Sequence, residues 1–367
     1  MPIIDTSAKT CAWLCNFRRL YSCGGGGGSR KLTLIPGDGI GPEITAAVQQ
    51  IFKAAAVPIE WESVAWTPAK NNEGKLELPQ NVLDSITTNR VAIKGPLAPV
   101  VENNTLLNFN VMLRKELQLY ANVRPCRSFV GCKTNYGAVD VVTIRESTEG
   151  EYIGIEHEIV PGVVQSIKLT TDEAVRRVAE YTFKYAKKFK RRKVTCVHKA
   201  NIMRMSDGHF LSVVRSVSEK FPDILFEERF LDTVCQNMIK NPKKFDVLVM
   251  PNLYGDIMSD LCCGLVGGPA LAPSGNLGAR AAVFEAVHGT VSKLAGKDAA
   301  NPTALLLSSI MLLRCIKLGE FGDAIEKALC NVIKEGKHLT QDLGGTAKCS
   351  EFTNEVCSKL GETTQKC

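Results

Sequence analysis

The sequence predicts an α/β protein, and three observations lead to this fold class. Beyond Lys31, short runs rich in β-branched residues alternate with stretches of helical periodicity. Several of these runs end on polar residues, as in open α/β sheets, which place ligands at the carboxyl ends of strands. The chain has 367 residues, of which 45% are hydrophobic and 23% charged, so it is long enough for one large or two ordinary domains.

The first predicted strand is Leu32–Ile35, and a glycine-rich turn follows it within "LTLIPGDGIGPEI" (32–44). Pro42 at the first helical position and Glu43 in the first turn indicate a helix start. A dinucleotide-binding Gly-x-Gly-x-x-Gly fingerprint would begin at Gly37, but Pro42 replaces its third glycine. The pattern predicts a strand, a turn and a helix, and leaves open what the turn binds.

Four further strands are predicted along the chain: Arg90–Lys94, Val139–Ile144, Lys193–Val197 and Asp246–Met250. Three of them are closely followed by polar residues, namely Arg145, the pair His198 and Lys199, and Asn252. These residues are candidates for a ligand site at the carboxyl ends of the strands.

The composition argues against several classes of function. No run of about 18 apolar residues occurs, so neither a membrane span nor a membrane partner is expected. The formal net charge is +7, and the basic cluster "KKFKRRK" (187–193) lacks interleaved aromatic residues. A solvated helix end is therefore favoured over a nucleic-acid site. The mild positive charge suits an anionic small substrate equally well.

Fourteen cysteines are present, but no CxxC pair and no repeated spacing indicates a zinc site. Several lie in apolar surroundings, where a cysteine acts as a small hydrophobic side chain; examples are Cys196, Cys262, Cys263 and Cys330. A chain of this length needs no disulfides, so a reducing compartment is expected.

The first 31 residues differ from the rest of the chain. Asp5 is the only acidic residue among five basic ones, aromatic and leucine side chains lie between them, and "GGGGGS" (24–29) follows. Residues 1–30 are therefore predicted to be an organellar import segment with a flexible linker. A disordered tail is the alternative.

Three arginines and a tyrosine are candidates for binding an anionic substrate. "NVMLRKELQLYANVRP" contains Arg114 and Arg124, and "VTIRESTEGEY" contains Arg145 and Tyr152. Guanidinium groups form paired hydrogen bonds with carboxylates, and a phenol can transfer a proton. Each arginine taken alone is better explained as a surface residue, so the hypothesis depends on the set.

Asp256 and Asp260 lie four residues apart in "NLYGDIMSDL", which places them on one face of a helix. Two like charges repel, and a divalent cation between them would explain the pair. The same spacing is also common on solvated helices. Asp232 in "DTVCQN" is a third candidate acid, and Lys199 offers a charge that titrates if it is buried. With the arginines, these residues suit a hydroxy acid that has several carboxylates.

Seven motifs, in order and over about nine-tenths of the chain, resemble one family: "IPGDGIGPE", "LRKELQLYANVRP", "RESTEGEYIGIEH", "VHKANIMRMSDG", "PNLYGDIMSDL", "HGT" and "GKDAANPTALLLS". From Lys31 to about Leu360 the chain resembles the β-decarboxylating dehydrogenases, the isocitrate/isopropylmalate dehydrogenase family. Within it, the catalytic (alpha-type) subunits of NAD-dependent isocitrate dehydrogenases are most similar.

The resemblance implies the family's two-domain α/β/α fold, which is not a Rossmann fold. A large cofactor-binding domain, residues 31–125 and 270–364, would be split around a smaller inserted domain. This smaller domain, residues 126–269, would contain the dimer interface and the metal helix.

The resemblance also implies a role for each candidate residue. The substrate carboxylates would be bound by Asn110, Arg114, Arg124 and Arg145. Mg²⁺ or Mn²⁺ would be held by Asp256 and Asp260, with Asp232 from a neighbouring subunit. Lys199, also from that subunit, would help to take the hydroxyl proton, and Tyr152 would protonate the enol left by decarboxylation. The NAD contacts would be His288, Gly289, Thr290, Lys293 and Asn301.

The implied activity is the oxidative decarboxylation of isocitrate to 2-oxoglutarate with reduction of NAD, in the mitochondrial matrix, within the tricarboxylic acid cycle. The implied assembly is a homodimer or a hetero-oligomer with related regulatory subunits. Two alternatives stay open: a catalytically weakened or regulatory paralogue, and 3-isopropylmalate dehydrogenase. The second is disfavoured by Asn110 and by "TEGEY" (148–152), which its pattern lacks.

Three departures from the alpha-type pattern bear on these expectations. Asn108 stands where those subunits have a serine, and "GPLAP" (95–99) lacks a threonine near the nicotinamide. Lys293 occupies the position of an acid that reads the cofactor ribose, which leaves the preference between NAD and NADP open.

Overall fold

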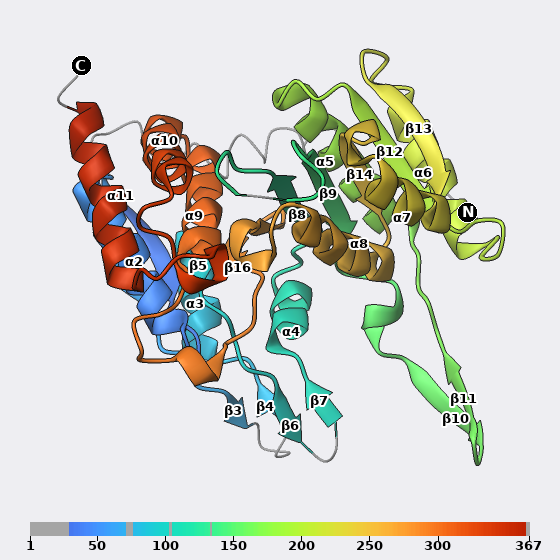
Figure 1. Ribbon diagram of the computed structural model, residues 1–367. Helices are drawn as coiled ribbons and strands as arrows, with labels where there is room; N and C mark the ends of the chain where they lie inside the picture. Colours follow the sequence, from blue (N-terminus) through green and yellow to red (C-terminus); the bar gives the residue numbers. More distant parts are fainter. Residues whose placement is uncertain (1–28, 71–75, 103–104, 133, 365–367) are drawn as a thin grey trace.

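The computed structural model describes residues 29–70, 76–102, 105–132 and 134–364. A ten-stranded sheet forms its centre, and helices cover both faces (Figure 1). The strands are β1 (Arg30–Ile35), β2 (Ile59–Ser63), β3 (Ala69–Lys70), β4 (Leu76–Glu77), β5 (Val91–Lys94), β6 (Val100–Glu102), β7 (Thr105–Leu107), β8 (Ala121–Arg127), β9 (Asp140–Glu146), β10 (Glu156–Val160), β11 (Val163–Ser166), β12 (Lys193–His198), β13 (Leu225–Phe230), β14 (Val247–Met250), β15 (Pro273–Leu277) and β16 (Ala282–Ala286). The helices are α2 (Gly41–Ala54), α3 (Gln80–Asn89), α4 (Phe109–Glu116), α5 (Asp172–Lys188), α6 (Ser206–Ser218), α7 (Leu231–Lys240), α8 (Asn252–Leu265), α9 (Thr303–Cys315), α10 (Gly319–Glu335) and α11 (Cys349–Thr364).

The strand order of the central sheet is β13-β12-β14-β9-β8-β15-β16-β5-β1-β2. The first four strands are parallel to one another, as are the last four. β8 and β15 join these two blocks by antiparallel pairing, so the blocks run in opposite directions. The carboxyl ends of their strands therefore lie at opposite edges of the sheet. The polar residues predicted to form a site, Arg145, His198 with Lys199, and Asn252, lie at or just after the ends of β9, β12 and β14. These strands all belong to the first block, so these residues lie at one edge of the sheet, as predicted.

The two faces of the sheet have different helices. One face is covered by α2, α5, α6 and α9, and α10 and α11 pack on α9 and α2. The other is covered by α7 and α8 over one block and by α3 and α4 over the other. Along β8, Arg124 and Cys126 face α8, because they contact Asp260 and Cys263. Since side chains alternate along a strand, Pro125 and Arg127 face the opposite side.

Helix α5 illustrates how the sequence defines its own elements. The Thr171 hydroxyl accepts a hydrogen bond from the backbone N–H of Ala174, which caps the first turn. Asp172 lies in the first turn and Lys188 in the last, so both charges complement the helix dipole. The basic cluster 187–193 is thus a largely exposed helix end, as predicted.

The five predicted strands are confirmed within two residues at each end, and α2 begins with Pro42 in its first turn, as expected. The strands that went unpredicted include β2, β8, β13, β15 and β16, which contain charged residues, prolines or glycines. β8 contains Pro125, and β15 begins at Pro273. Both residues interrupt the apolar alternation by which strands are recognised.

The α/β/α class is confirmed. The domain boundaries at 125/126 and 269/270 stay a prediction, because one continuous sheet includes strands from both parts. The predicted import segment lies outside the described residues. No helix in the described ranges is long and apolar enough to cross a membrane. All ten cysteines in the described ranges have free thiols, which agrees with their predicted role as small side chains.

A β-hairpin formed by β10 and β11 extends away from the body of the molecule (Figure 1). Every residue of both strands is exposed. Several of these residues are apolar, such as Ile159, Val160 and Val164. An exposed apolar hairpin is typical of a surface that another chain covers.

Candidate active site

Helix α8 brings two acids against two buried arginines. Asp256 forms an ion pair with Arg145, and Asp260 forms one with Arg124 at 2.6 Å. The spacing of four residues places both carboxylates on the helix face that lies over β8 and β9. Each aspartate is thus neutralised by an arginine, and the repulsion predicted from the sequence is relieved within the chain.

The side chain of Arg145 is only 1% exposed. Its Nε donates to the Asn252 side chain at 2.8 Å. Burial, followed by the nearby positive charge of Arg114, lowers the pKa of Arg145 to about 10, so this guanidinium remains charged at neutral pH. Burial would raise the pKa of Asp256. The positive charge of Arg145 and the hydrogen bond from Tyr152 outweigh burial, so the pKa is lowered. Asp256 is therefore a carboxylate at neutral pH.

Tyr152 lies beside this pair, in the short helical turn Glu151–Ile153 that follows β9. Its hydroxyl donates a hydrogen bond to the second oxygen of Asp256, and its ring lies 4.8 Å from the Arg145 guanidinium carbon. Burial, and then the Asp256 carboxylate, raises the pKa of Tyr152. The phenol is protonated at neutral pH and can act as an acid.

Arg114 belongs to a second buried network, which lies on the same face of the sheet, next to β15 and β16. Its guanidinium donates to Asn276 and to Glu285, both at 3.0 Å, and Lys94 forms an ion pair with Glu285 at 2.6 Å. Burial would raise the pKa of Glu285, but Lys94 and Arg114 hold it well below its usual range. Asn122 donates to the Asn276 side chain at 2.9 Å and so connects the network to β8.

Three side chains with predicted roles have buried polar atoms that lack a hydrogen-bond partner in the described part of the chain. These atoms are Oδ1 of Asn110, Nε of Arg124 and Nε2 of His288. An unpaired buried polar atom costs about 1 to 3 kcal/mol, so such atoms indicate positions where a ligand supplies the missing partner.

The glycine-rich turn after β1 packs against two other loops. The backbone N–H of Asp38 donates to Pro96, and that of Ile40 donates to Thr290. A Cβ atom at Gly39, which has a φ of +60°, would collide with the Thr290 carbonyl. The turn is therefore close to residues 288–294, the predicted cofactor loop, and its glycines permit this close approach.

Within the cofactor loop, the Nδ1 of His288 lies 3.1 Å from the carbonyl oxygen of Gly289. Burial lowers the pKa of His288, which favours the neutral imidazole. Lys293 is exposed, and the structure gives it no ion pair with any described residue. Asn301 is buried and bonds Asp342 at 2.9 Å and the Thr303 N–H at 3.0 Å. The cofactor roles of these residues stay predictions.

Lys199 and Asp232 form a pair that is separate from the aspartates of α8 and their arginines. Lys199 follows β12 and Asp232 lies in the first turn of α7, and they form an ion pair at 2.8 Å. The hydrogen bond from Lys199 is the largest cause of the lowered pKa of Asp232. In the part of the chain that the structure describes, neither residue forms a hydrogen bond or ion pair with Asp256 or Asp260, so the two pairs of residues are separate within one chain.

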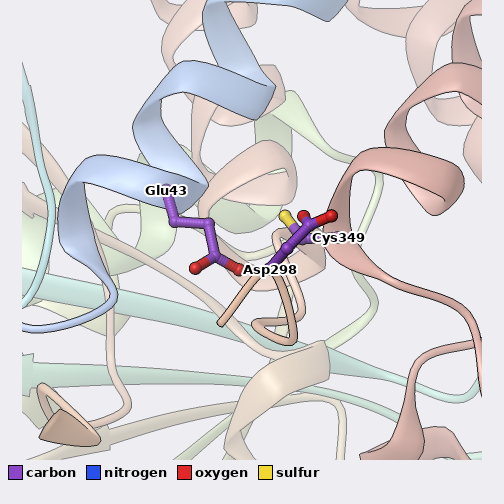
Figure 2. Close-up of side chains that lie close together, drawn as sticks. All are labelled: Glu43, Asp298 and Cys349. Atoms are coloured by element: carbon purple, nitrogen blue, oxygen red, sulfur yellow. The ribbon is translucent and has the colours of Figure 1, made fainter. Parts of the chain in front are cut away.

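Among the described residues, one group of potential metal ligands is close enough to share an ion: Glu43, Asp298 and Cys349 (Figure 2). Burial, and then the two carboxylates, raises the pKa of the Cys349 thiol to about 12, so the thiol is protonated at neutral pH. Asp298 instead accepts hydrogen bonds from the N–H and hydroxyl of Ser350 at the start of α11. Glu43 accepts one from the Ala300 N–H. This group connects α2, α11 and the loop that precedes α9.

Asn108, which replaces a serine of the alpha-type pattern, has a structural role in this chain. It is the N-cap of α4, and its side chain accepts a hydrogen bond from the Asn110 N–H at 3.0 Å. The segment that follows "GPLAP" (95–99) contains the antiparallel pair β6 and β7. The side chains of this hairpin lie largely outside the described residues.

Four residues of the buried network around Arg114 were not predicted from the sequence: Lys94, Asn122, Asn276 and Glu285. Each is a charged or amide residue within a buried strand. Such residues are rarely buried without partners. This signal was available in runs such as "VAIK" and "AVFEA", where a single charge accompanies apolar residues.

The pattern of the isocitrate/isopropylmalate dehydrogenase family matches residues 31–356. The chain belongs to this family. A Drosophila melanogaster member, the probable isocitrate dehydrogenase (NAD) subunit alpha, mitochondrial, is 66% identical over 334 residues, which cover 91% of this chain and 88% of that one. The human isocitrate dehydrogenase (NAD) subunit alpha, mitochondrial, is 54% identical over 360 residues, covering 95% and 98%.

A solved structure of isocitrate dehydrogenase from Methylococcus capsulatus has the same fold. It is 41% identical, with a TM-score of 0.83, and the match covers 90% of this chain and 99% of that one. The fold of the isocitrate/isopropylmalate dehydrogenase family, expected from the seven motifs, is confirmed.

Proposed function

We propose that this chain is a catalytic subunit of a mitochondrial NAD-dependent isocitrate dehydrogenase of the tricarboxylic acid cycle. It oxidises isocitrate to 2-oxoglutarate and CO₂ and reduces NAD. The observation that supports this most is the group on α8, β8 and β9, in which Asp256 and Asp260 lie against Arg145 and Arg124. Relatives at 54% to 66% identity over nearly the whole chain have the same activity in their names.

Three guanidinium groups match the three carboxylates of isocitrate. Arg114, Arg124 and Arg145 come from α4, β8 and β9, and all lie on the side of the sheet that α4 and α8 cover. In the free chain they are paired with Glu285, Asp260 and Asp256. The unpaired Arg124 Nε and Asn110 Oδ1 leave hydrogen-bonding capacity for substrate. Guanidinium groups held in fixed positions bind a carboxylate with two parallel hydrogen bonds.

Asp256 and Asp260 supply the hard carboxylate oxygens that Mg²⁺ and Mn²⁺ prefer. We propose that they hold the ion together with Asp232 of a second chain. A bound divalent cation supplies Lewis acidity for both the oxidation and the loss of CO₂. Lys199 of the second chain receives the hydroxyl proton of the substrate. Tyr152, a protonated phenol beside Asp256, returns a proton to carbon after decarboxylation.

A second chain is needed because Lys199 and Asp232 are separate from the α8 constellation. Exposed apolar side chains surround both regions: Ile202, Met205, Phe230 and Ile257. Apolar residues exposed to this extent are typical of an interface between chains. The projecting β10–β11 hairpin provides a further apolar surface. We propose a second copy of this chain or a related subunit as the partner.

NAD held at this site would supply the hydride acceptor for the substrate carbon that bears the hydroxyl. The loop 288–294 is proposed to bind its adenosine half, with His288 Nε2 as an available polar atom. His288, Gly289, Thr290, Lys293 and Asn301 are the contacts we propose.

The proposal is tested by assaying purified chain with isocitrate and Mn²⁺, using NAD or NADP, with and without co-expressed related subunits. Reduction of NAD that depends on Mn²⁺ and releases CO₂ is expected. Turnover of 3-isopropylmalate but not isocitrate, or no turnover in any combination, would overturn it. Calorimetric titration with Mn²⁺ and isocitrate tests the metal separately: Asp260→Asn should weaken Mn²⁺ binding, whereas Asp298→Asn should not.

A further inference from the structure

A cavity of about 500 Å³ lies on the face of the sheet opposite the proposed active site. We refer to it as the α5–α9 cavity, because residues of both helices line it. Pro125 and Arg127 of β8 also line it, and these are the residues that point away from α8. The volume is within the range of about 300 to 1,000 Å³ that small-molecule sites occupy. The cavity is therefore separate from the arginine and aspartate constellation.

The inner wall of the cavity is apolar. Leu277 and Phe284 come from β15 and β16, and Leu307 and Ile310 come from α9; all four are buried. Met311 of α9 is partly buried and lines the same wall. A wall of this composition favours an aliphatic chain and gives no hydrogen-bonding partners to a polar one.

The outer rim of the cavity contains charged residues, and the acids among them already have partners. Asp140 forms an ion pair with Arg191 at 2.7 Å, and Glu326 forms one with Arg314. Both acids and both arginines line the cavity. These four charges therefore compensate one another.

Three other lining cations have no such compensation. Lys188, Lys190 and Arg127 form no ion pair with any acid in the described ranges. Lys188 ends α5 and Lys190 follows it in a left-handed conformation with a φ of +53°, so both belong to the same turn. The rim thus has an excess of positive charge next to the apolar wall.

We propose that the α5–α9 cavity binds an amphipathic monocarboxylate, with its aliphatic chain on the wall of Leu277, Phe284 and Met311 and its carboxylate at Lys188 and Lys190. The apolar wall disfavours a ligand that is charged along its length, such as a polycarboxylate. The cation excess disfavours a neutral apolar ligand relative to an anionic one.

The site is tested with octanoate as the probe, by isothermal titration calorimetry on the full chain. Octanoate is expected to bind at one site, more tightly than 1-octanol of the same chain length and more tightly than acetate, which has the same charge. Equal affinity for octanoate and octanol would overturn the carboxylate position. No saturable octanoate binding would overturn the site itself.

Variants locate the site. Lys188→Glu combined with Lys190→Glu should weaken octanoate binding at least about fivefold, because two attractions become repulsions. Lys187→Glu is the matched control, since Lys187 is an exposed lysine of the same helix end that does not line the cavity. An equal loss in the control would contradict the assignment.

Met311→Trp, which fills the cavity, should abolish octanoate binding, whereas retained binding would place the ligand elsewhere. The melting temperature of each variant is measured without ligand, so that a folding defect is recognised. If Met311→Trp does not fold, the charge variants and their control still decide between these outcomes.

Discussion

The proposed metal site needs two sets of charges that differ in their burial: the α8 aspartates with their arginines, and Asp232 with Lys199. Arg145, almost fully buried, fixes Asp256 against β9, while Asp232, with 67% of its side chain exposed, forms an ion pair with Lys199 at the surface. The first set is neutralised and rigid within one chain. The second lies on the surface and its residues are free to meet another molecule. The difference indicates that one chain prepares the substrate pocket and another chain completes it.

The difference also has an energetic side. A buried arginine that loses its carboxylate is left as an uncompensated charge, which costs several kcal/mol. An exposed ion pair such as Lys199 with Asp232 contributes between about 0 and 1 kcal/mol. Residues of the first set therefore affect both folding and catalysis, whereas residues of the second set should affect catalysis alone.

The first prediction separates the two sets. Asp256→Asn and Asp232→Asn should each lower isocitrate turnover at least about a hundredfold, on the scale of losing an electrostatic contact to the transition state. Only Asp256→Asn should also lower the melting temperature, because Arg145 loses its counter-charge. Turnover is measured with saturating Mn²⁺ and NAD, and melting is followed by circular dichroism.

Glu60→Gln serves as the control for this pair, since Glu60 is an exposed acid of β2. It should change neither turnover nor melting. The comparison fails if Asp232→Asn destabilises the chain as much as Asp256→Asn does.

The second prediction concerns Glu285, the buried acid of the neighbouring network. Glu285→Gln should lower the free energy of unfolding by about 3 to 5 kcal/mol, because Lys94 and Arg114 keep their charges without a carboxylate. Urea unfolding monitored by fluorescence measures this change. A loss below about 1 kcal/mol, the size expected for an exposed pair, would show that this network is not desolvated as its burial indicates.

The same residue gives a pH dependence. The folded-state pKa of Glu285 lies well below its unfolded value of about 4.3. Its stabilising effect is therefore complete above that value and declines as the pH falls toward the folded-state pKa. Between about pH 5.5 and pH 3.5, wild type should lose more stability than Glu285→Gln. Equal losses in both proteins would contradict the depressed pKa.

The fold was predictable where local pattern determines structure. The strand ending at Lys94 and the helix with Asp256 and Asp260 were read from apolar runs and from helical spacing. The order of the strands was not predictable in this way, because it depends on pairings such as that of β8 with β15, between residues about 150 positions apart. The opposite directions of the two parallel blocks follow from those pairings.

The candidate site was predictable in its residue types more than in its contacts. The sequence motifs identified the arginines and aspartates, but they did not indicate that Arg145 neutralises Asp256 or that Lys94 compensates Glu285. Those pairings depend on which side chains the fold buries together. A single sequence does not contain this information in a local pattern.

The third prediction tests the exposed set directly. A Lys199→Met chain and an Arg114→Ala chain should each be inactive. Mixed after unfolding and refolding, they should recover about a quarter of wild-type activity, because half of the dimers are mixed and each mixed dimer has one intact site. As the matched control, Lys199→Met mixed with Asp232→Asn should recover none, since both defects affect the donated set. Recovery in neither mixture, with mixed dimers verified by mass spectrometry, would contradict a site shared between chains.

The smallest expected effect concerns Lys293, which resembles Asp232 in being exposed but is proposed to meet the cofactor instead of a second chain. An acid at this position binds the ribose hydroxyls of NAD and repels the 2′-phosphate of NADP, whereas a lysine attracts that phosphate. A partly exposed pair is worth about 1 kcal/mol, so the effect is about fivefold at most. Lys293→Asp should therefore raise the NAD-to-NADP ratio of kcat/KM by a few-fold, while Lys297→Asp, an exposed lysine four residues further along, should leave it unchanged. If both substitutions change the ratio equally, the cause is the overall charge of the loop. If neither does, Lys293 does not contact the ribose, and the loop holds the cofactor through His288 and the backbone alone.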